Sequence, residues 1–412
     1  MGAGTAKPAV SLRGWFLVLM LLCLQFGVSY HLSVAAFLIL VLLISARRTL
    51  RLPGPGILAG LGLVFLLPAL VYEATQTGSL QFLRTLREML LCLILLALLQ
   101  SSHSPPSIEA RKWVGYSTAI IVTLVLLQAT QQTRGAVLVV PDWLFALKQD
   151  GALAYKGLLH SLKHNYMFFF RPSATFSEPS YLGMVCCCLF VMAGRTHTGT
   201  QRFTIFALLF MVCVVASTAL GILGVLALYG TSVAKENARI APVVGMLGLV
   251  VGFLALFMIG AEKMAPGRLG LLLSGRDISG LARFYEPFAL ILHNAEHQFF
   301  GVPATEAAVY YDRFGLIPAL DDPPLHNGLL NLLIFYGYGG LVLLFLLFSS
   351  LKTTEERLLL LIVGMQNGEI FSYSKVALLV LVVWVVKSHR HGFRAAVQPV
   401  RPSGEVPRVQ HA

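Results

Sequence analysis

Long apolar runs fill most of the chain, and short stretches rich in Arg, Lys, Gly and Pro separate them. A membrane-spanning helix needs about 20 predominantly apolar residues, so each run is a candidate span. Several runs are shorter than this, and we therefore predict about 12 transmembrane helices, within a range of about 10 to 13. The predicted spans lie near residues 15–30, 32–46, 56–72, 88–101, 113–130, 180–194, 203–217, 219–234, 240–260, 326–349, 358–371 and 373–388.

Positive charges are distributed unevenly among the connections between these runs. More than half of the 31 lysines and arginines fall in the N-terminal segment, in alternate short connections and in the C-terminal tail. Cytoplasmic connections carry such an excess, so we expect both termini in the cytoplasm. Residues 1–388 would then form a single transmembrane domain, and the polar segment 389–412 would be a disordered cytoplasmic tail.

Two connections on the outer side are long. We call them loop A, about residues 131–179, and loop B, about residues 261–325. Long loops escape the charge bias, and in compact proteins they are usually functional or disordered. Their aromatic and apolar residues favour ordered loops that carry function.

The composition excludes an ordinary soluble protein. Hydrophobic residues make up 57% of the chain and charged residues 12%, against about 25% charged in soluble domains. We therefore predict an all-α polytopic membrane protein, in which the net charge of +12 reflects topology and not a nucleic-acid partner. The six cysteines lie in apolar runs without CxxC spacing, which predicts neither disulfides nor a zinc site.

Arginines stand where the outer loops approach the membrane. Arg171 is near the end of loop A, and Arg276 and Arg283 lie seven residues apart in loop B, on one face if that segment is helical. Guanidinium groups suit phosphate or pyrophosphate, which they bind in a fixed fork geometry. Two alternatives stay open: Arg171 could anchor to lipid headgroups, and the other two could pair with Asp277 and Glu286 on a solvated helix.

The start of the tenth predicted span carries His326 and Asn327. An imidazole with its ordinary pKa of about 6.5 can take a proton from a hydroxyl. This imidazole and the arginines together are suited to the transfer of a group from a lipid pyrophosphate to an alcohol. Such a reaction would need no metal and no cofactor. Alternatively, His326 could be a helix-start residue hydrogen-bonded to Asp321 or Asp322.

Two further polar residues, Glu178 and Ser180, lie just before the sixth predicted span. They are candidate substrate-binding residues, although Glu178 could instead be the N-cap of that span. Two histidine pairs have the i, i+4 spacing of metal ligands but lack the HExxH order, so we expect no metal site; they are His160 with His164 and His293 with His297. Residues 280–300 are typical of an amphipathic helix on the membrane face.

Four stretches form an ordered set between about residues 165 and 385. His326-Asn327, nine residues and then "GYGG" match the pattern H[NSQ]x9Gxx[GTY], and "SGRDISGLARFYEP" with "HQFFGVP" precedes it. "RPSATFSEPSYLG" and "STALGILG" come earlier. The set resembles the O-antigen ligase and polymerase superfamily (the Wzy and WaaL proteins), with Pro303 where that superfamily has the last glycine of a Phe-Gly-Val-Gly run.

The resemblance implies a GT-C-like, metal-independent, inverting glycosyltransferase of the bacterial inner membrane. It would act on the periplasmic face on undecaprenyl-pyrophosphate-linked oligosaccharide. His326 becomes the candidate base, Arg171 and Arg276 the pyrophosphate-binding arginines, and Arg283 and Asn327 supporting residues. Membrane lipid and a chain-length regulator protein are further candidate partners.

The Glu-Pro-Ser stretch favours a polymerase of O-antigen or exopolysaccharide repeat units. The first alternative is a ligase that transfers finished glycan to the lipid A core. The second is a flippase or transporter of lipid-linked oligosaccharide, which is less favoured because the predicted spans are nearly free of charge in their middles.

Overall fold

The computed structural model describes residues 14–29, 31–46, 50–75, 79–100, 110–133, 172–216, 218–236, 286–293, 299–302, 327–366 and 368–397. Within these ranges the chain forms thirteen helices and no strand, which confirms the all-α prediction. The helices are α1 (Gly14–Leu22), α2 (Val34–Ala46), α3 (Pro55–Thr75), α4 (Ser79–Gln100), α5 (Ala110–Thr133), α7 (Pro179–Thr196), α8 (Gly199–Val215), α9 (Ala219–Glu236), α13 (Glu286–His293), α15 (Gly328–Tyr336), α16 (Tyr338–Ser350), α17 (Thr354–Gly364) and α18 (Tyr373–Val397).

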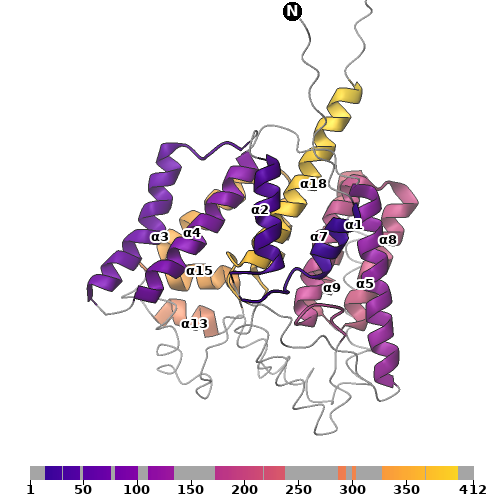
Figure 1. The fold of residues 1–412 in the computed structure, drawn as a ribbon, viewed down its shortest axis with the longest axis horizontal. Helices are drawn as coiled ribbons and strands as arrows, with labels where there is room; N and C mark the ends of the chain where they lie inside the picture. The colour runs from indigo at the N-terminus through magenta and orange to yellow at the C-terminus, as the bar shows by residue number, and fades with distance from the viewer. Residues whose placement is uncertain are drawn as a thin grey trace, which may run out of the picture.

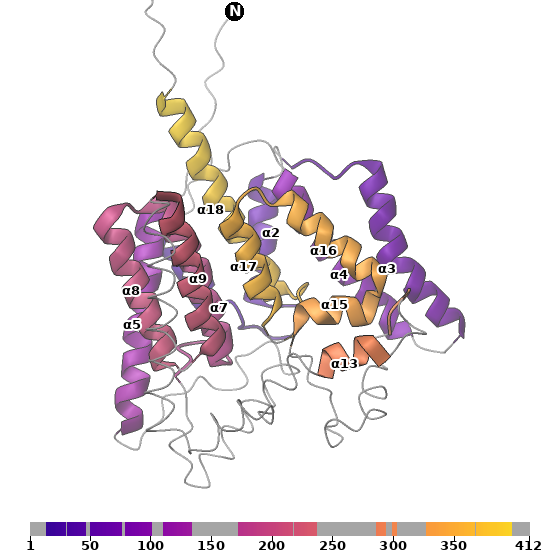
Figure 2. The same cartoon turned by 180° about the vertical axis from the view of Figure 1, so that it is seen from behind.

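Most helices run alternately up and down between two faces (Figures 1 and 2). The face at the top of Figures 1 and 2 is formed by the ends of α2, α4, α7, α9 and α16 and by the starts of α3, α5, α8 and α17. We call it the basic face, because the helix ends there carry Arg111, Lys112, Arg195, Arg202, Lys352 and Arg357. At the opposite face, α13 and α15 lie across the ends of the other helices.

Polar contacts tie the helix ends together at the basic face. Arg111 of α5 donates to the side chain of Gln201 in α8 over 2.6 Å. Arg195 of α7 pairs with Glu355 of α17 over 2.8 Å. The first contact joins two helix starts and the second joins a helix end to a helix start, so the basic face is held together by polar contacts between helices.

The central helix of one half of the molecule is α7, whose residues 181–193 are all buried. It packs against α5, α8, α9, α17 and α18. Gly183 and Gly221 let α7 and α9 approach closely, since a Cβ on Gly221 would lie 2.7 Å from the Cα of Gly183. Small residues serve this purpose at helix crossings in membranes.

All six cysteines are free thiols. Five of them, including Cys186, Cys187 and Cys188 of α7, are buried. These three fill the interior beside Cys213 of α8 and Gly221 of α9, so their predicted role as small core residues is confirmed.

The outward surfaces of the helices are apolar. In α2, Phe37, Leu40 and Ile44 lie on one side at helical spacing, and each is about half exposed. Trp15 of α1 is exposed as well. Two described helices are also long and apolar enough to cross a bilayer, Ala110–Gln131 within α5 and Pro179–Thr196. Exposed apolar stripes on apolar helices are typical of a membrane protein.

Five predicted boundaries were wrong. α1 ends at Leu22 and not at residue 30, and α18 continues beyond residue 388 to Val397, into the segment predicted to be a disordered tail. The tenth predicted span, 326–349, is broken at Gly337, whose φ of 52° and ψ of −133° end α15 and begin α16. α4 begins at Ser79 and not near residue 88, because its early charges have partners in the fold. α17 ends at Gly364, before the predicted residue 371. The predicted span 240–260 and most of loops A and B lie outside the described residues.

Candidate functional site

Asn327 is the N-cap of α15. Its side-chain oxygen accepts hydrogen bonds from the backbone N–H groups of Leu329 (3.1 Å) and Leu330 (3.2 Å), and the residue is 2% exposed. The first N–H groups of a helix have no partner within the helix, and an unsatisfied group is costly in an apolar setting. Capping of α15 therefore explains why an asparagine stands directly before a long apolar run, and the side-chain oxygen of Asn327 is occupied by this cap.

The start of α15 rests on the turn between α17 and α18. A Cβ on Gly328 would lie 2.7 Å from the carbonyl oxygen of Gly368 and 2.9 Å from that of Gly364. The buried Lys375 closes this turn, because its Nζ donates to the carbonyl oxygens of Gln366 (3.1 Å) and Gly368 (2.9 Å). The residue that follows Asn327 is thus held against backbone that is itself fixed.

A network of charged side chains lies beside the other end of α15. Arg84 and Arg87, one turn apart in α4, both donate to the carboxylate of Glu369, with a 2.7 Å contact from Arg87. Arg84 also donates to Glu88 over 3.3 Å, and the hydroxyl of Tyr336, the last residue of α15, donates to Glu88 over 2.8 Å. Two guanidinium groups are therefore balanced by two carboxylates.

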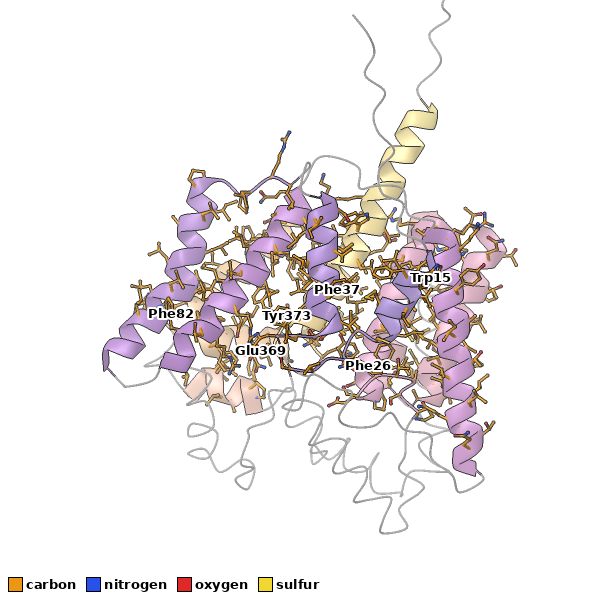
Figure 3. The ribbon with its side chains drawn as sticks, in the orientation of Figure 1. Trp15, Phe26, Phe37, Phe82, Glu369 and Tyr373 are labelled. Carbon is orange, nitrogen blue, oxygen red and sulfur yellow. The ribbon has the colours of Figure 1, made fainter. Side chains whose placement is uncertain are left out.

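Sequence reasoning missed this network. Arg84 and Arg87 were placed before the fourth predicted span and Glu88 at its first residue, although their i, i+3, i+4 spacing puts all three on one side of a helix. Their partner Glu369 is far away in the sequence, and Figure 3 shows it among the side chains near the lower end of the bundle. The sequence did contain a signal: the three charged residues of α4 form a cluster that lies outside both long loops.

The segment that precedes the histidine motif also packs on α15. The backbone N–H of Val302 donates to the carbonyl oxygen of Ile334 over 2.6 Å. Gly301 has a φ of 76°, and a Cβ there would collide with the backbone of Phe335 and Tyr336. α13, within the predicted amphipathic segment 280–300, packs against α15 as well. The described part of "FFGVP" thus supports the end of α15.

The end of loop A is fixed on α1 and α5. The Gln128 side chain of α5 donates to the carbonyl oxygen of Ala174 (2.8 Å) and accepts from the N–H groups of Ser173 (3.0 Å) and Ala174 (2.8 Å). Thr175 donates from its hydroxyl to the carbonyl oxygen of Leu22 over 2.6 Å. The "PSATFSE" part of the motif is therefore ordered by bonds to helices on either side.

Glu178 occupies the N-cap position of α7, as the structural alternative predicted, but its side chain makes no capping bond to the helix. Its carboxylate instead accepts from the hydroxyl of Ser180 over 2.8 Å, and both residues are partly exposed. They lie at the start of α7, on the same face as the start of α15 (Figure 1).

The other predicted site residues, His326, Arg171, Arg276 and Arg283, lie outside the described residues. Two of them are next to described segments: Arg171 precedes Pro172, and His326 precedes Asn327. Among the described residues, no three His, Cys, Asp or Glu side chains gather as metal ligands would. The roles of these four residues stay predictions.

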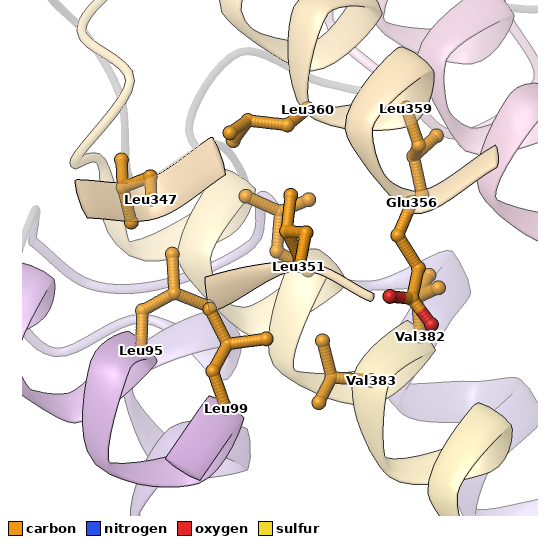
Figure 4. Close-up of a pocket in the computed structure, with 10 residues that line it drawn as sticks. Leu95, Leu99, Leu347, Leu351, Glu356, Leu359, Leu360, Val382 and Val383 are labelled. Atoms are coloured by element: carbon orange, nitrogen blue, oxygen red, sulfur yellow. The ribbon is translucent and has the colours of Figure 1, made fainter. Parts of the chain in front are cut away.

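An apolar pocket lies towards the basic face, between α4, α16, α17 and α18 (Figure 4). Its lining is Leu95, Leu99, Leu347, Leu351, Glu356, Leu359, Leu360, Leu379, Val382 and Val383. The carboxylate of Glu356 accepts from the N–H groups of Lys352 (2.9 Å) and Thr353 (3.2 Å) in a capping box for α17. This pocket therefore has the chemistry of helix packing and not that of the polar groups around α15.

Comparison with known proteins extends the resemblance seen in the motifs. A sequence model of the family described as WcaD colanic acid polymerase matches residues 10–388. The match includes residues 10–130, which the motifs did not cover. Searches of curated proteins and of solved structures gave no match. Because the family match spans most of the 412 residues, the chain belongs to the WcaD colanic acid polymerase family.

Proposed function

We propose that this protein is a GT-C-like glycosyltransferase that joins repeat units of an exopolysaccharide, such as colanic acid, or of O-antigen. The family match over residues 10–388 is the observation that carries this proposal. The substrate would be oligosaccharide linked to undecaprenyl pyrophosphate in the bacterial inner membrane. The basic face would lie in the cytoplasm with both termini, and α13 and α15 would lie on the periplasmic side, about twelve spans separating the two compartments.

His326 would act as the general base of an inverting, metal-independent transfer. It takes the proton of the acceptor hydroxyl as that oxygen forms a bond to the anomeric carbon of the donor sugar. The bond between this carbon and the pyrophosphate oxygen breaks, and undecaprenyl pyrophosphate leaves. Arg171 and Arg276, with Arg283 in support, would stabilise the negative charge that develops on the leaving group.

The contacts that hold α15 in place support the assignment of His326 as the general base. Asn327 caps the helix, Gly328 rests on the α17–α18 turn, and Tyr336 is bonded at the far end. A base must lie within hydrogen-bond reach of the proton that it takes. The helix that follows His326 in the sequence is held at both ends, which favours this residue as the base.

Loss of the gene distinguishes the polymerase from the two alternatives. We expect a deletion strain to make no long polymer, and for O-antigen to attach single repeat units to its acceptor, because export and attachment still work. Long glycan on undecaprenyl pyrophosphate would instead indicate a ligase, and single lipid-linked units that stay on the cytoplasmic side would indicate a flippase. Gel electrophoresis of the surface glycan with extraction of the lipid-linked pool measures all three outcomes.

Arg276 tests the pyrophosphate assignment. Arg276→Lys keeps the charge but loses the bidentate fork, so we expect its turnover to be roughly tenfold lower than that of the wild type. We expect the turnover of Arg276→Ala to be lower still. The same order is expected at Arg171. Arg268→Ala, in the same loop, is the control and should behave like the wild type. Equal activity of the lysine and arginine forms at both positions would show that charge attraction alone is sufficient.

A further inference from the structure

The charged network joins three parts of the chain that are distant in sequence. Arg84, Arg87 and Glu88 come from α4, Tyr336 ends α15, and Glu369 lies in the α17–α18 turn. The same turn supports Gly328 at the start of α15, with the carbonyl oxygens of Gly364 and Gly368 facing it. The network therefore acts on both ends of one nine-residue helix.

The contacts at the far end of α15 are of two kinds. The ring of Tyr336 packs against Phe65 of α3 with a centroid distance of 4.7 Å, and Arg84 lies over the ring of Phe335 at 5.5 Å. The Tyr336 hydroxyl adds a directional bond to Glu88, whose side chain is only 3% exposed. Apolar packing would keep the helix in place, whereas the hydroxyl and the carboxylates set its rotation and its position along the axis.

Burying a group of charges to hold a helix in place costs free energy. Taking ions out of water costs several kcal/mol each, and apolar residues of similar volume often serve stability as well or better. Charged residues inside membrane helices are mostly functional. Arg84, Arg87 and Glu369 have side-chain exposures of 26%, 17% and 16%, so the network is mostly shielded from solvent.

We propose that Arg84, Arg87, Glu88, Glu369 and Tyr336 are positioning residues for the transfer reaction. They fix α15 at both ends, and with it the cap Asn327, the residue that follows His326 in the sequence. This inference rests on the proposed function, in which His326 is the base. A misplacement of about 1 Å can cost roughly 10²-fold in rate, so a rigid seat for α15 has a direct effect on turnover.

Two mild substitutions test the inference in the purified full-length protein. Tyr336→Phe removes only the hydroxyl and keeps the ring against Phe65, and Glu369→Gln removes the charge that binds both arginines. We expect each to lower kcat roughly tenfold, in line with the loss of a hydrogen bond to a charged group, with the KM for lipid-linked repeat units unchanged. In a His326→Ala background, neither change should reduce the residual activity further.

The ion pair at the basic face provides a matched control. Glu355→Gln removes the same charge from a 2.8 Å pair with Arg195, at a similar exposure of 14% for the carboxylate side chain. We expect wild-type kcat from this variant. Yield and thermal unfolding of each protein show whether the folded fraction is comparable.

Several results would overturn the inference. Wild-type kcat in both network variants would do so, as would an equal loss in the presence and absence of His326, because a general structural defect acts in both backgrounds. A raised KM with unchanged kcat would assign the arginines to substrate binding. If His326→Ala itself were nearly as active as the wild type, the proposed base would be rejected, and this role of the network with it.

Discussion

Replacing His326 with alanine is expected to lower the rate of repeat-unit transfer by about 10²- to 10⁴-fold, the usual contribution of general-base catalysis. The hydroxyl of a sugar is a poor nucleophile until its proton is accepted. The helix that follows should be unaffected, since its cap is the side chain of Asn327 and not of His326. Elongation of radiolabelled lipid-linked repeat units by the purified protein is the measurement.

Two controls separate catalysis from structure. His31→Ala changes a histidine whose Nδ1 lies 3.4 Å from the hydroxyl of Tyr373, and we expect this variant to retain activity. Asn327→Asp keeps an oxygen that can cap α15, so it should retain stability, whereas Asn327→Ala should lose about 1 kcal/mol. Near-normal elongation by His326→Ala would leave His326 with the structural role that was its alternative.

The helical class and much of the interior could be predicted from the sequence, because both depend on local pattern. Apolar runs in α5 and α7 became long apolar helices, and Cys186, Cys187 and Cys188 became core residues because α7 is surrounded by other helices. The N-cap position of Glu178 followed from a polar residue before a proline and an apolar run. Each of these inferences needed only neighbouring residues.

The break in the tenth span and the early start of α4 depend on contacts between distant residues. Gly337 sits within a long, largely apolar run, and the chain turns there because α15 lies across the ends of other helices. Arg84 and Arg87 argue against a membrane-spanning helix in the sequence, because their ion pairs with Glu369 form only in the folded chain. A signal was present: these two arginines and Lys375 are the cations left over once the cytoplasmic segments and the two long loops are counted.

In the candidate site, too, some features follow from the local sequence and others from contacts between distant residues. The sequence singled out Asn327, and the structure gives it a definite task as the cap of α15. The predicted chemistry of His326, Arg171, Arg276 and Arg283 depends on resemblance to a family, and it lies outside the described residues. What the structure adds is a set of supports for α15 that no motif indicated, because they come from α4 and the α17–α18 turn.

The largest structural effect is expected from Gly301→Ala. Gly301 has a φ of 76°, which costs a residue with a Cβ roughly 1–2 kcal/mol, and its Cβ would also collide with the backbone of Phe335 and Tyr336. Because the obstacle is backbone, no side-chain rotation relieves it. Either residues 299–302 leave α15 and break the bond from Val302 to Ile334, or α15 itself shifts.

We expect Gly301→Ala to lower turnover by roughly 10²-fold, the effect of a displacement of about 1 Å at a reacting group, and to lower the thermal unfolding temperature. Gly62→Ala is the matched control: this glycine lies inside α3, and a Cβ there meets no atom within 4 Å. Alanine favours a helix over glycine by about 1 kcal/mol, so that variant should be as stable as the wild type or more so. A Gly301→Ala protein with normal turnover and normal unfolding would show that the contact between residues 299–302 and α15 is dispensable. The stabilisation of α15 would then depend on its other contacts, among them those of Asn327, Gly328 and the charged network.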